Sequence, residues 1–472
     1  MKNKIIYILL AAAFIISSCD DTLEQQFSDN LEVSDAIVDL NSLNLAANGT
    51  YSLFLDEDDD RDGDVYSRTL LLLPEILSDN AFIDAFDNTG RYLDFDLYTV
   101  NANNGNVGRT WEDITRIIAT TSIIIREAEL LMFPESEQED AEQYIGEMYA
   151  LRALAFHNLQ LLFAQPYNFT ADASHLGVPI PDFETLGNGS TIQEPGRSTT
   201  AQVYEQIESD LLKAIDLMRA ESSPARMDVH AARALLARVY LHMENWTGAR
   251  DIATQVINNS GNSLLENQEY IASWGLDDNS ETLFTLVSNE TDNSGTNSIG
   301  YFYLTYEDAF ATDDFVNTLS DTDVRKELYP AKGDVNLVQK FPKVQFQDDN
   351  IQVLRLSELY LIKAEAHAQL NEDLLAQQAL DLIIQRADPS AITSTETGQA
   401  LIDKIILERR KELAYEGFRL YDLTRYGRTF NKFLQDGDPI PISAPENRTI
   451  MPIPIDEINV NPNIANQQNP GY

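Results

Sequence analysis

The chain of 472 residues contains a single cysteine, Cys19. One cysteine cannot form an internal disulfide, so we expect the fold to be held together by buried apolar area. Basic residues are also scarce, because 33 lysines and arginines stand against 76 acidic residues and give a formal net charge of −43. Such a surface repels phosphate backbones, which excludes nucleic acid as an expected partner and favours neutral or cationic ligands. The simpler alternative is that the charge only keeps an exported protein soluble.

The most apolar stretch, Ile5 to Ile16, follows Lys2 and Lys4 and is too short to span a bilayer core of about 30 Å. This arrangement predicts a secretion signal. The boundary Ile16-Ser17-Ser18-Cys19 resembles a bacterial lipobox, in which cleavage leaves a lipidated cysteine as the new N-terminus. We therefore predict a signal peptide over residues 1–18, a mature chain over 19–472, and a lipid anchor on Cys19 that needs no transmembrane helix. An ordinary signal peptide followed by a chance cysteine is the alternative.

Sequence signatures of common enzymes are missing. The chain has no nucleophile elbow, Walker loop, HExxH motif or dinucleotide fingerprint, and its five histidines lack zinc-ligand spacing. Acidic residues do recur at helical spacing over 355–365 and 408–419, but arginines are interleaved with them. We expect structural ion pairs there, since neighbouring arginines keep carboxylates ionised and not poised for acid catalysis. The sequence predicts that the protein is not an enzyme.

Amphipathic periodicity predicts a mainly α-helical fold, because apolar residues return every three or four positions through most of the chain. The expected helices are Ile114–Leu131, Ala141–Phe163, Thr200–Met218, Val229–Met243, Thr247–Ile257, Val353–Leu370, Leu374–Ile384 and Ala400–Tyr415. Strand-like sequence is short, as at Thr282–Val287. Thr199 and Gln202 have the spacing of a capping box at the start of one helix. The segments 80–110, 258–350 and 430–472 are expected to be rich in loops.

Small residues indicate that some of these helices form pairs. Ala237 and Ala249 have the twelve-residue spacing of a tetratricopeptide motif, and Ala364 and Ala376 repeat it. Small side chains at these positions let two antiparallel helices approach closely. We expect these pairs to form helical layers inside a globular body.

Four segments together resemble one known family. Leu151 to Phe156 with Phe163 to Tyr167, Leu354 to Ala366, Glu408 to Leu423, and Pro452 to Tyr472 are similar to successive signatures of the SusD/RagB outer-membrane lipoproteins. The resemblance covers the whole length and implies a SusD-like body, with an N-terminal part over about 19–220 and a C-terminal RagB/SusD part over about 225–472.

The same resemblance implies a function. It predicts a surface-exposed lipoprotein of the outer membrane that binds oligo- or polysaccharide and delivers it to a SusC-type TonB-dependent transporter. Asp20 and Asp21 fit the acidic residues that follow the lipidated cysteine in this family. Two alternatives stay open, namely a RagB-like protein that captures peptides and a helical scaffold without a small ligand.

Aromatic residues outside the helical periodicity are the candidates for saccharide contacts, because sugars stack their apolar faces on aromatic planes. The predicted glycan-binding residues are Trp274, Tyr301, Tyr303, Phe82, Phe86 and Tyr92. For each of them, the alternative is an aromatic side chain that fixes a loop to the core. Trp111 and Trp246 begin predicted helices and are expected in the core.

One acidic loop has the pattern of a calcium site. Asp58, Asp60, Asp62 and Asp64 place oxygen donors at alternate positions around Gly63. The twelfth position of the loop is Thr69, where a bidentate glutamate is typical. The sequence therefore leaves two predictions, a Ca²⁺ site and a solvated acidic loop.

Overall fold

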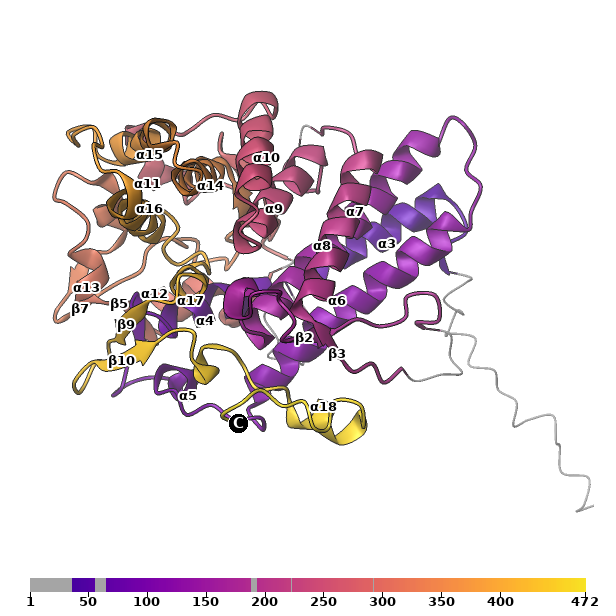
Figure 1. The fold of residues 1–472 in the computed structure, drawn as a ribbon, viewed down its shortest axis with the longest axis horizontal. Coiled ribbons are helices and arrows are strands. Elements are labelled where there is room, and N and C mark those ends of the chain that lie inside the picture. Colours follow the sequence, from indigo (N-terminus) through magenta and orange to yellow (C-terminus); the bar gives the residue numbers. More distant parts are fainter. Residues whose placement is uncertain (1–35, 56–64, 188–192, 222, 292) are drawn as a thin grey trace, which may run out of the picture.

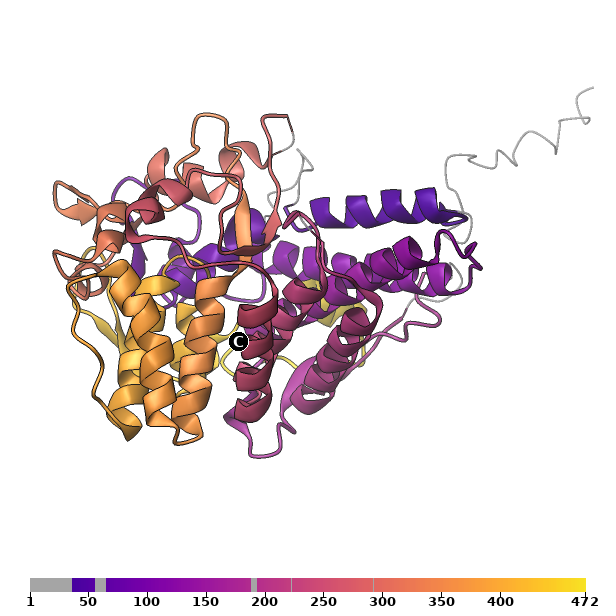
Figure 2. The same cartoon turned by 90° about the horizontal axis from the view of Figure 1, so that it is seen from above.

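The structure is a computed structural model that describes residues 36–55, 65–187, 193–221, 223–291 and 293–472. Helices dominate, and the strands are short (Figures 1 and 2). One hydrophobic core extends through the chain from Ile37 to Ile464. A second cluster, which includes Leu361, Leu380 and Leu401, lies among the C-terminal helices. Within the described residues, no helix combines the length and apolarity needed to cross a membrane.

The N-terminal helices form one side of the molecule (Figure 1). They are α3 (Leu40–Ser52), α6 (Gly105–Glu129), α7 (Gln138–Phe163) and α8 (Thr200–Leu217). Helix α7 packs against both α6 and α8, and Gly146 permits this close approach, since a Cβ atom there would lie 2.5 Å from Met218 Cγ. The capping box at the start of α8 is confirmed, because Gln202 N–H donates to Thr199 Oγ1 and Gln202 Oε1 accepts from Thr199 N–H.

The predicted helix pairs are confirmed on the other side. They comprise α9 (Val229–His242) with α10 (Trp246–Asn259) and α14 (Leu356–Gln369) with α15 (Asp373–Ala387), followed by α16 (Gly398–Glu412). Their small residues are fully buried, namely Ala237, Ala249, Ala364 and Ala376. Helix α10 also packs on α14, so the two pairs stack against each other although they are far apart in sequence (Figure 2).

Short strands and helices fill the remaining segments. The helices are α4 (Leu70–Ile76), α5 (Leu93–Asp96), α11 (Tyr270–Ser273), α12 (Ile299–Leu304), α13 (Asp313–Val316), α17 (Arg419–Arg425) and α18 (Ile455–Val460). One sheet has the order β1 (Ala81–Ile83), β5 (Ala309–Ala311), β7 (Val335–Asn336), β6 (Ala331–Lys332). The antiparallel pairs are β2 (Leu176–Pro179) with β3 (Arg197–Thr199), β4 (Thr282–Leu286) with β8 (Ile351–Arg355), and β9 (Thr429–Lys432) with β10 (Ile440–Ser443).

Some predicted helix boundaries differ from the observed ones. Helix α6 begins at Gly105, well before the expected Ile114. The periodic segment beginning at Val353 was expected to be helical from its start, but residues 351–355 form β8 and the helix begins at Leu356. The reason is tertiary, since β8 pairs with β4 and places Val353 and Leu354 in the core.

The acidic rows form buried ion pairs, as the interleaved arginines predicted. Glu412 is fully buried and accepts from Arg325 Nη1 at 3.0 Å, Arg355 Nη1 at 2.7 Å and Arg386 Nη2 at 2.5 Å. Arg238 Nη2 lies 2.6 Å from Glu358 Oε2. Both carboxylates, Glu412 and Glu358, therefore form ion pairs with buried arginines.

Candidate ligand-binding surface

A loop between β1 and α5, residues 84–91, is fixed to two distant parts of the chain. Asp84 N–H donates to the carbonyl of Asp308 at 2.8 Å, and Thr89 N–H donates to Asp308 Oδ1 at 3.0 Å. On the other flank, Ala85 N–H donates to Gln435 Oε1 at 2.6 Å. The loop therefore lies against the segment that follows α12 and beside the connection between β9 and β10.

The loop itself is held in a defined turn. Asp84 Oδ1 accepts the N–H groups of Phe86 at 2.7 Å and Asp87 at 3.1 Å, as an Asx turn does. Asn88 Oδ1 accepts the N–H of Gly90 at 2.6 Å, and Gly90 adopts a φ of 83° that glycine tolerates without steric cost. This organised turn presents Phe86, whose side chain is 75% exposed.

Two tyrosines lie beside Arg91, the last residue of this loop. The rings of Tyr301 and Tyr306 meet edge to face, with centroids 4.9 Å apart, and both side chains are half-buried. The guanidinium carbon of Arg91 lies 4.6 Å from the centroid of the Tyr306 ring, which is the geometry of a cation–π contact. Arg91 Nη1 also donates to Asn297 Oδ1 at 3.4 Å. We call the set Phe86, Arg91, Asn297, Tyr301 and Tyr306 the aromatic loop surface.

Three of the predicted glycan-binding aromatics do not reach this surface. Tyr303 is fully buried, Tyr92 is 1% exposed and Phe82 is 9% exposed. Tyr92 packs edge to face on Phe302, with centroids 5.7 Å apart, and Phe82 packs on Phe310 across the β1–β5 pair. Their rings are occupied by core contacts, so we correct the prediction for these three residues and regard them as supports of the loop.

Trp274 lies elsewhere. Its half-buried ring covers the buried ammonium of Lys340, with Nζ 4.2 Å from the ring centroid, and meets Tyr270 edge to face at 6.1 Å. Lys340 Nζ in turn lies 2.5 Å from Glu416 Oε1. The Trp274 ring thus shields a buried ion pair, which is the structural alternative considered for this residue. A glycan contact by its remaining exposed area stays a prediction.

Sequence reasoning missed Tyr306 and Arg91. Tyr306 follows Tyr301 by five residues and sits outside the helix, because α12 ends at Leu304. Arg91 is the only basic residue between Pro74 and Arg109, in a stretch rich in Asp and Asn. The isolated arginine, next to Tyr92 in a polar stretch, was the sequence feature that could have marked this segment as a binding candidate.

A charged side chain from a distant segment of the chain packs against the start of α12. Asp349 is buried beside Gly300, where a Cβ atom would lie 2.8 Å from Asp349 Oδ2, and its carboxylate accepts the N–H of Lys343 at 3.1 Å. Burial raises the pKa of Asp349 to about 7, because desolvation outweighs this hydrogen bond and the charge of Lys343. A close approach of backbone and carboxylate therefore fixes the helix that carries Tyr301.

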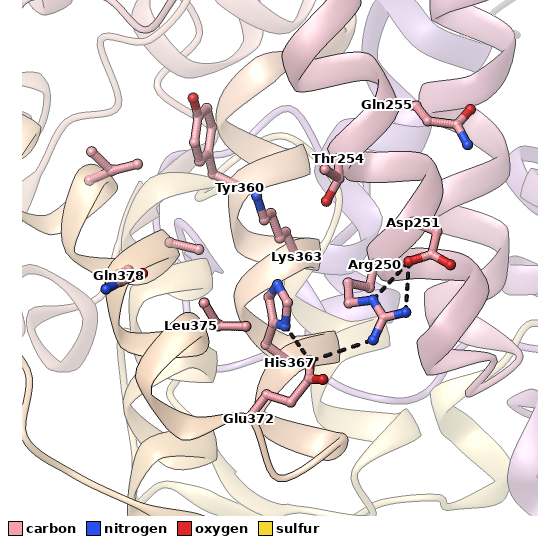
Figure 3. A pocket seen from close by; sticks show the side chains of 12 residues that line it. Arg250, Asp251, Thr254, Gln255, Tyr360, Lys363, His367, Glu372, Leu375 and Gln378 are labelled. Atoms are coloured by element: carbon pink, nitrogen blue, oxygen red, sulfur yellow. Dashed lines mark hydrogen bonds and ion pairs between the residues drawn. The ribbon is translucent and has the colours of Figure 1, made fainter.

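A separate open groove of about 820 Å³ lies between α10, α14 and α15. Figure 3 shows Tyr360, Lys363 and His367 along one helix, facing Arg250 and its neighbours on another. Within this groove, His367 Nδ1 lies 2.6 Å from Glu372 Oε2, and Arg250 Nη1 lies 3.5 Å from the same oxygen. Dashed lines mark these contacts in Figure 3. The groove contains one aromatic side chain, that of Tyr360, among the residues that line it.

The groove and the aromatic loop surface differ in what they offer. The groove combines paired ions with aliphatic side chains such as Leu375 and Leu382, and its helices bond their backbone groups internally. The aromatic loop surface offers ring faces together with amide and guanidinium donors, which suit a saccharide better.

Two predicted sites lie outside the described residues. They are the lipidation site Cys19 and the acidic loop Asp58, Asp60, Asp62 and Asp64. Among the residues that the structure does describe, no three His, Cys, Asp or Glu side chains are grouped to hold a metal ion.

Comparison with known proteins places the fold. The SusD family model matches residues 277–472, and a model described as "Starch-binding associating with outer membrane" matches residues 55–241. SusD-like protein P25 of Formosa agariphila is 24% identical over 100% of this chain and 99% of its own.

Solved structures agree with these matches. A putative sugar binding protein from Bacteroides vulgatus is 29% identical, with a TM-score of 0.83 over 93% of this chain and 99% of that chain. A SusD superfamily protein from Bacteroides thetaiotaomicron is 30% identical, with a TM-score of 0.83 over 92% of this chain and 100% of that chain. The expected mainly α, SusD-like fold is therefore confirmed, and the chain belongs to the SusD family.

Proposed function

We propose that this chain is a non-catalytic lipoprotein of the outer membrane, exposed at the cell surface, that binds oligo- or polysaccharide on the aromatic loop surface. The observation that carries the proposal is that Tyr301, Tyr306, Arg91 and Asn297 contact one another beside the loop that exposes Phe86. Ring faces stack on the C–H faces of sugars, and the polar groups fix orientation through hydroxyls. The similarity to a putative sugar binding protein supports the same ligand class.

The proposed surface draws on both halves of the chain. Phe86 and Arg91 come from the part that we propose as N-terminal, about 19–220, whereas Asn297, Tyr301 and Tyr306 come from the C-terminal part, about 225–472. Because the turn around Asp84 is held by hydrogen bonds before any ligand arrives, little ordering is needed on binding.

Transfer of the captured saccharide to a SusC-type TonB-dependent transporter completes the proposal. This partner is inferred from the family, and Cys19 would hold the protein beside it through its lipid. Co-purification from outer membranes is the direct measurement. A tagged wild-type chain should retain a TonB-dependent transporter after detergent extraction, and recovery of no such transporter would contradict the partnership.

Anchoring is tested separately. We expect radiolabelled palmitate to enter the wild-type chain and not the Cys19→Ala variant. Equal labelling of both chains, or labelling of neither, would contradict the lipid anchor.

Saccharide binding is tested by affinity electrophoresis on neutral and acidic polysaccharides. Removal of one ring–sugar contact costs about 0.5–1.5 kcal/mol, so Phe86→Ala and Tyr306→Ala should each weaken binding roughly 2- to 12-fold. Phe169→Ala is the matched control, because Phe169 is 47% exposed and packs on His175 away from this surface. Trp274→Ala is measured in the same assay to test the predicted saccharide contact of Trp274. Unchanged retardation of the Phe86 and Tyr306 variants would remove the aromatic loop surface from the function.

A further inference from the structure

Within the part of the chain that the structure describes, Arg91 has no countercharge, although the protein is strongly acidic. Arginines elsewhere in the described chain are typically paired with carboxylates, as in Arg152 with Asp210 at 2.6 Å and Arg325 with Asp323 at 2.8 Å. Arg91 makes no such ion pair with any described residue. In a chain with a net charge of −43, a guanidinium that pairs with no described carboxylate and lies at the proposed ligand surface is a candidate for contact with a ligand.

The acidic residues around Arg91 are occupied by other donors. Asp308 accepts the N–H and the hydroxyl of Thr89, and Asp84 Oδ1 accepts the backbone N–H groups of its own turn. Glu307 lies 2.5 Å from Lys332 Nζ. These carboxylates therefore have other partners, and no described carboxylate forms an ion pair with Arg91.

The guanidinium is also held in place with donors to spare. Its Nε donates to Thr89 Oγ1 at 3.0 Å and its Nη1 donates to Asn297 Oδ1 at 3.4 Å, while the Tyr306 ring covers one of its faces. A guanidinium has five N–H donors, so these two bonds leave most of the Nη1–Nη2 fork unbonded. That fork matches the two oxygens of a carboxylate or a sulfate, with which it forms paired charge-assisted hydrogen bonds.

We propose that the aromatic loop surface selects saccharides with anionic substituents, carboxylate or sulfate, and that Arg91 is the residue that recognises them. This inference rests on the proposed saccharide-binding function and names its substrate class. The sugar rings stack on Phe86, Tyr301 and Tyr306, and the anionic group of one residue lies against the Arg91 fork.

The negative net charge of the protein makes binding of an acidic polysaccharide a specific test of the proposed site. Long-range repulsion opposes adsorption of a polyanion anywhere on a surface of charge −43, so retention by an acidic polysaccharide requires a local site. A bridging divalent cation is the competing route, and EDTA in the buffer removes it.

The first experiment is affinity electrophoresis of the mature protein in EDTA, on polygalacturonate and carrageenan as acidic gels and on starch, xylan and laminarin as neutral gels. We expect retardation by at least one acidic polysaccharide. Retardation by neutral polysaccharides alone would overturn this inference and leave the proposed function standing. Retardation by none of the gels would overturn the proposed function and this inference together.

The second experiment compares matched oligosaccharides from the acidic polysaccharide that retards the protein, by calorimetry. The partner of tetragalacturonate is its methyl ester, and the partner of a carrageenan tetrasaccharide is the desulfated form, so the two arms distinguish carboxylate from sulfate. A charge-assisted fork predicts that wild type binds the anionic form roughly 10- to 100-fold more tightly than its neutral partner. A ratio near one for wild type would overturn the inference.

Variants of Arg91 test whether this residue causes the preference for the anionic over the neutral oligosaccharide. We expect Arg91→Gln to lower the ratio to near one and Arg91→Lys, which keeps the charge but loses the fork, to give an intermediate value. Arg233→Gln is the charge-matched control, because Arg233 is a half-buried arginine on α9 that makes no ion pair within the described residues. It should keep the wild-type ratio. If Arg91→Gln weakens the anionic and neutral forms by the same factor, Arg91 only supports the loop and the assignment is wrong.

Discussion

Replacement of Glu412 by glutamine should destabilise the fold without touching the ligand surface. Glu412 is fully buried on α16 and accepts hydrogen bonds from Arg325, Arg355 and Arg386. The variant keeps the shape of the side chain but removes the negative charge on which three buried guanidinium groups converge. Loss of one partner from a buried ion pair costs about 3–5 kcal/mol, because the remaining charge stays buried and uncompensated.

This cost converts into a shift of the melting temperature. A chain of this length unfolds with an entropy of about 1 kcal/mol/K, so Glu412→Gln should lower Tm by about 3–5 °C in differential scanning calorimetry at pH 7. Glu205→Gln is the control, since Glu205 is exposed on α8, and it should shift Tm by less than about 1 °C.

The pH dependence of the Glu412→Gln effect checks its electrostatic origin. Burial raises the pKa of Glu412, but the charges of Arg386, Arg355 and Arg325 outweigh burial and hold this pKa well below 4.5. A depressed pKa in the folded state stabilises the protein above the unfolded value and loses that effect as the pH falls. The difference between wild type and variant should therefore be full above about pH 5 and shrink below about pH 4.5. A Tm within about 1 °C of wild type at pH 7, or a difference that grows in acid, would refute the reasoning.

Two further substitutions test buried contacts elsewhere in the fold. Burial raises the pKa of Asp349 to about 7, so wild type loses stability as the pH rises from about 4 to about 7. Asp349→Asn removes this carboxylate, and the variant should gain about 2–4 kcal/mol of stability relative to wild type across this range. A pH-independent difference between the two proteins in denaturant melts would contradict this prediction. Gly417→Ala should cost about 3 kcal/mol or more, because Gly417 has a φ of 85° and an added Cβ would collide with the carbonyl of Leu70. Gly333→Ala, at a φ of 62° in open space, should cost only about 1–2 kcal/mol, and equal losses for the two glycines would show that the Leu70 contact is unimportant.

The helical frame was predictable because its signals are local. The apolar spacing of α7 and the cap formed by Thr199 and Gln202 lie within one helix each, and the alanines of the helix pairs follow a fixed interval. The start of α14 was not predictable in this way. Val353 to Arg355 fit the helical period, but pairing with β4, which is distant in sequence, overrides it.

The residues of the proposed ligand surface were predictable only in part, because exposure is a tertiary property. Phe86 is exposed and Tyr301 is half-buried, so saccharide contacts by these two residues stay a prediction, whereas Tyr303 is fully buried. Ile299, Phe302 and Tyr303 have the spacing of one helical face, which could have indicated a buried side for α12. Tyr92 packs on the nearby Phe95, but it also packs on Phe302, which is distant in sequence and which no local pattern could indicate.

The way in which the loop 84–91 is anchored has a consequence for biogenesis. Its two attachment points, Asp308 and Gln435, are synthesised well after the loop itself. A nascent or truncated chain that ends before residue 300 would contain the turn around Phe86 but neither Tyr301 nor the acceptor at Asp308. The proposed binding surface is therefore complete only in a chain that extends beyond Gln435.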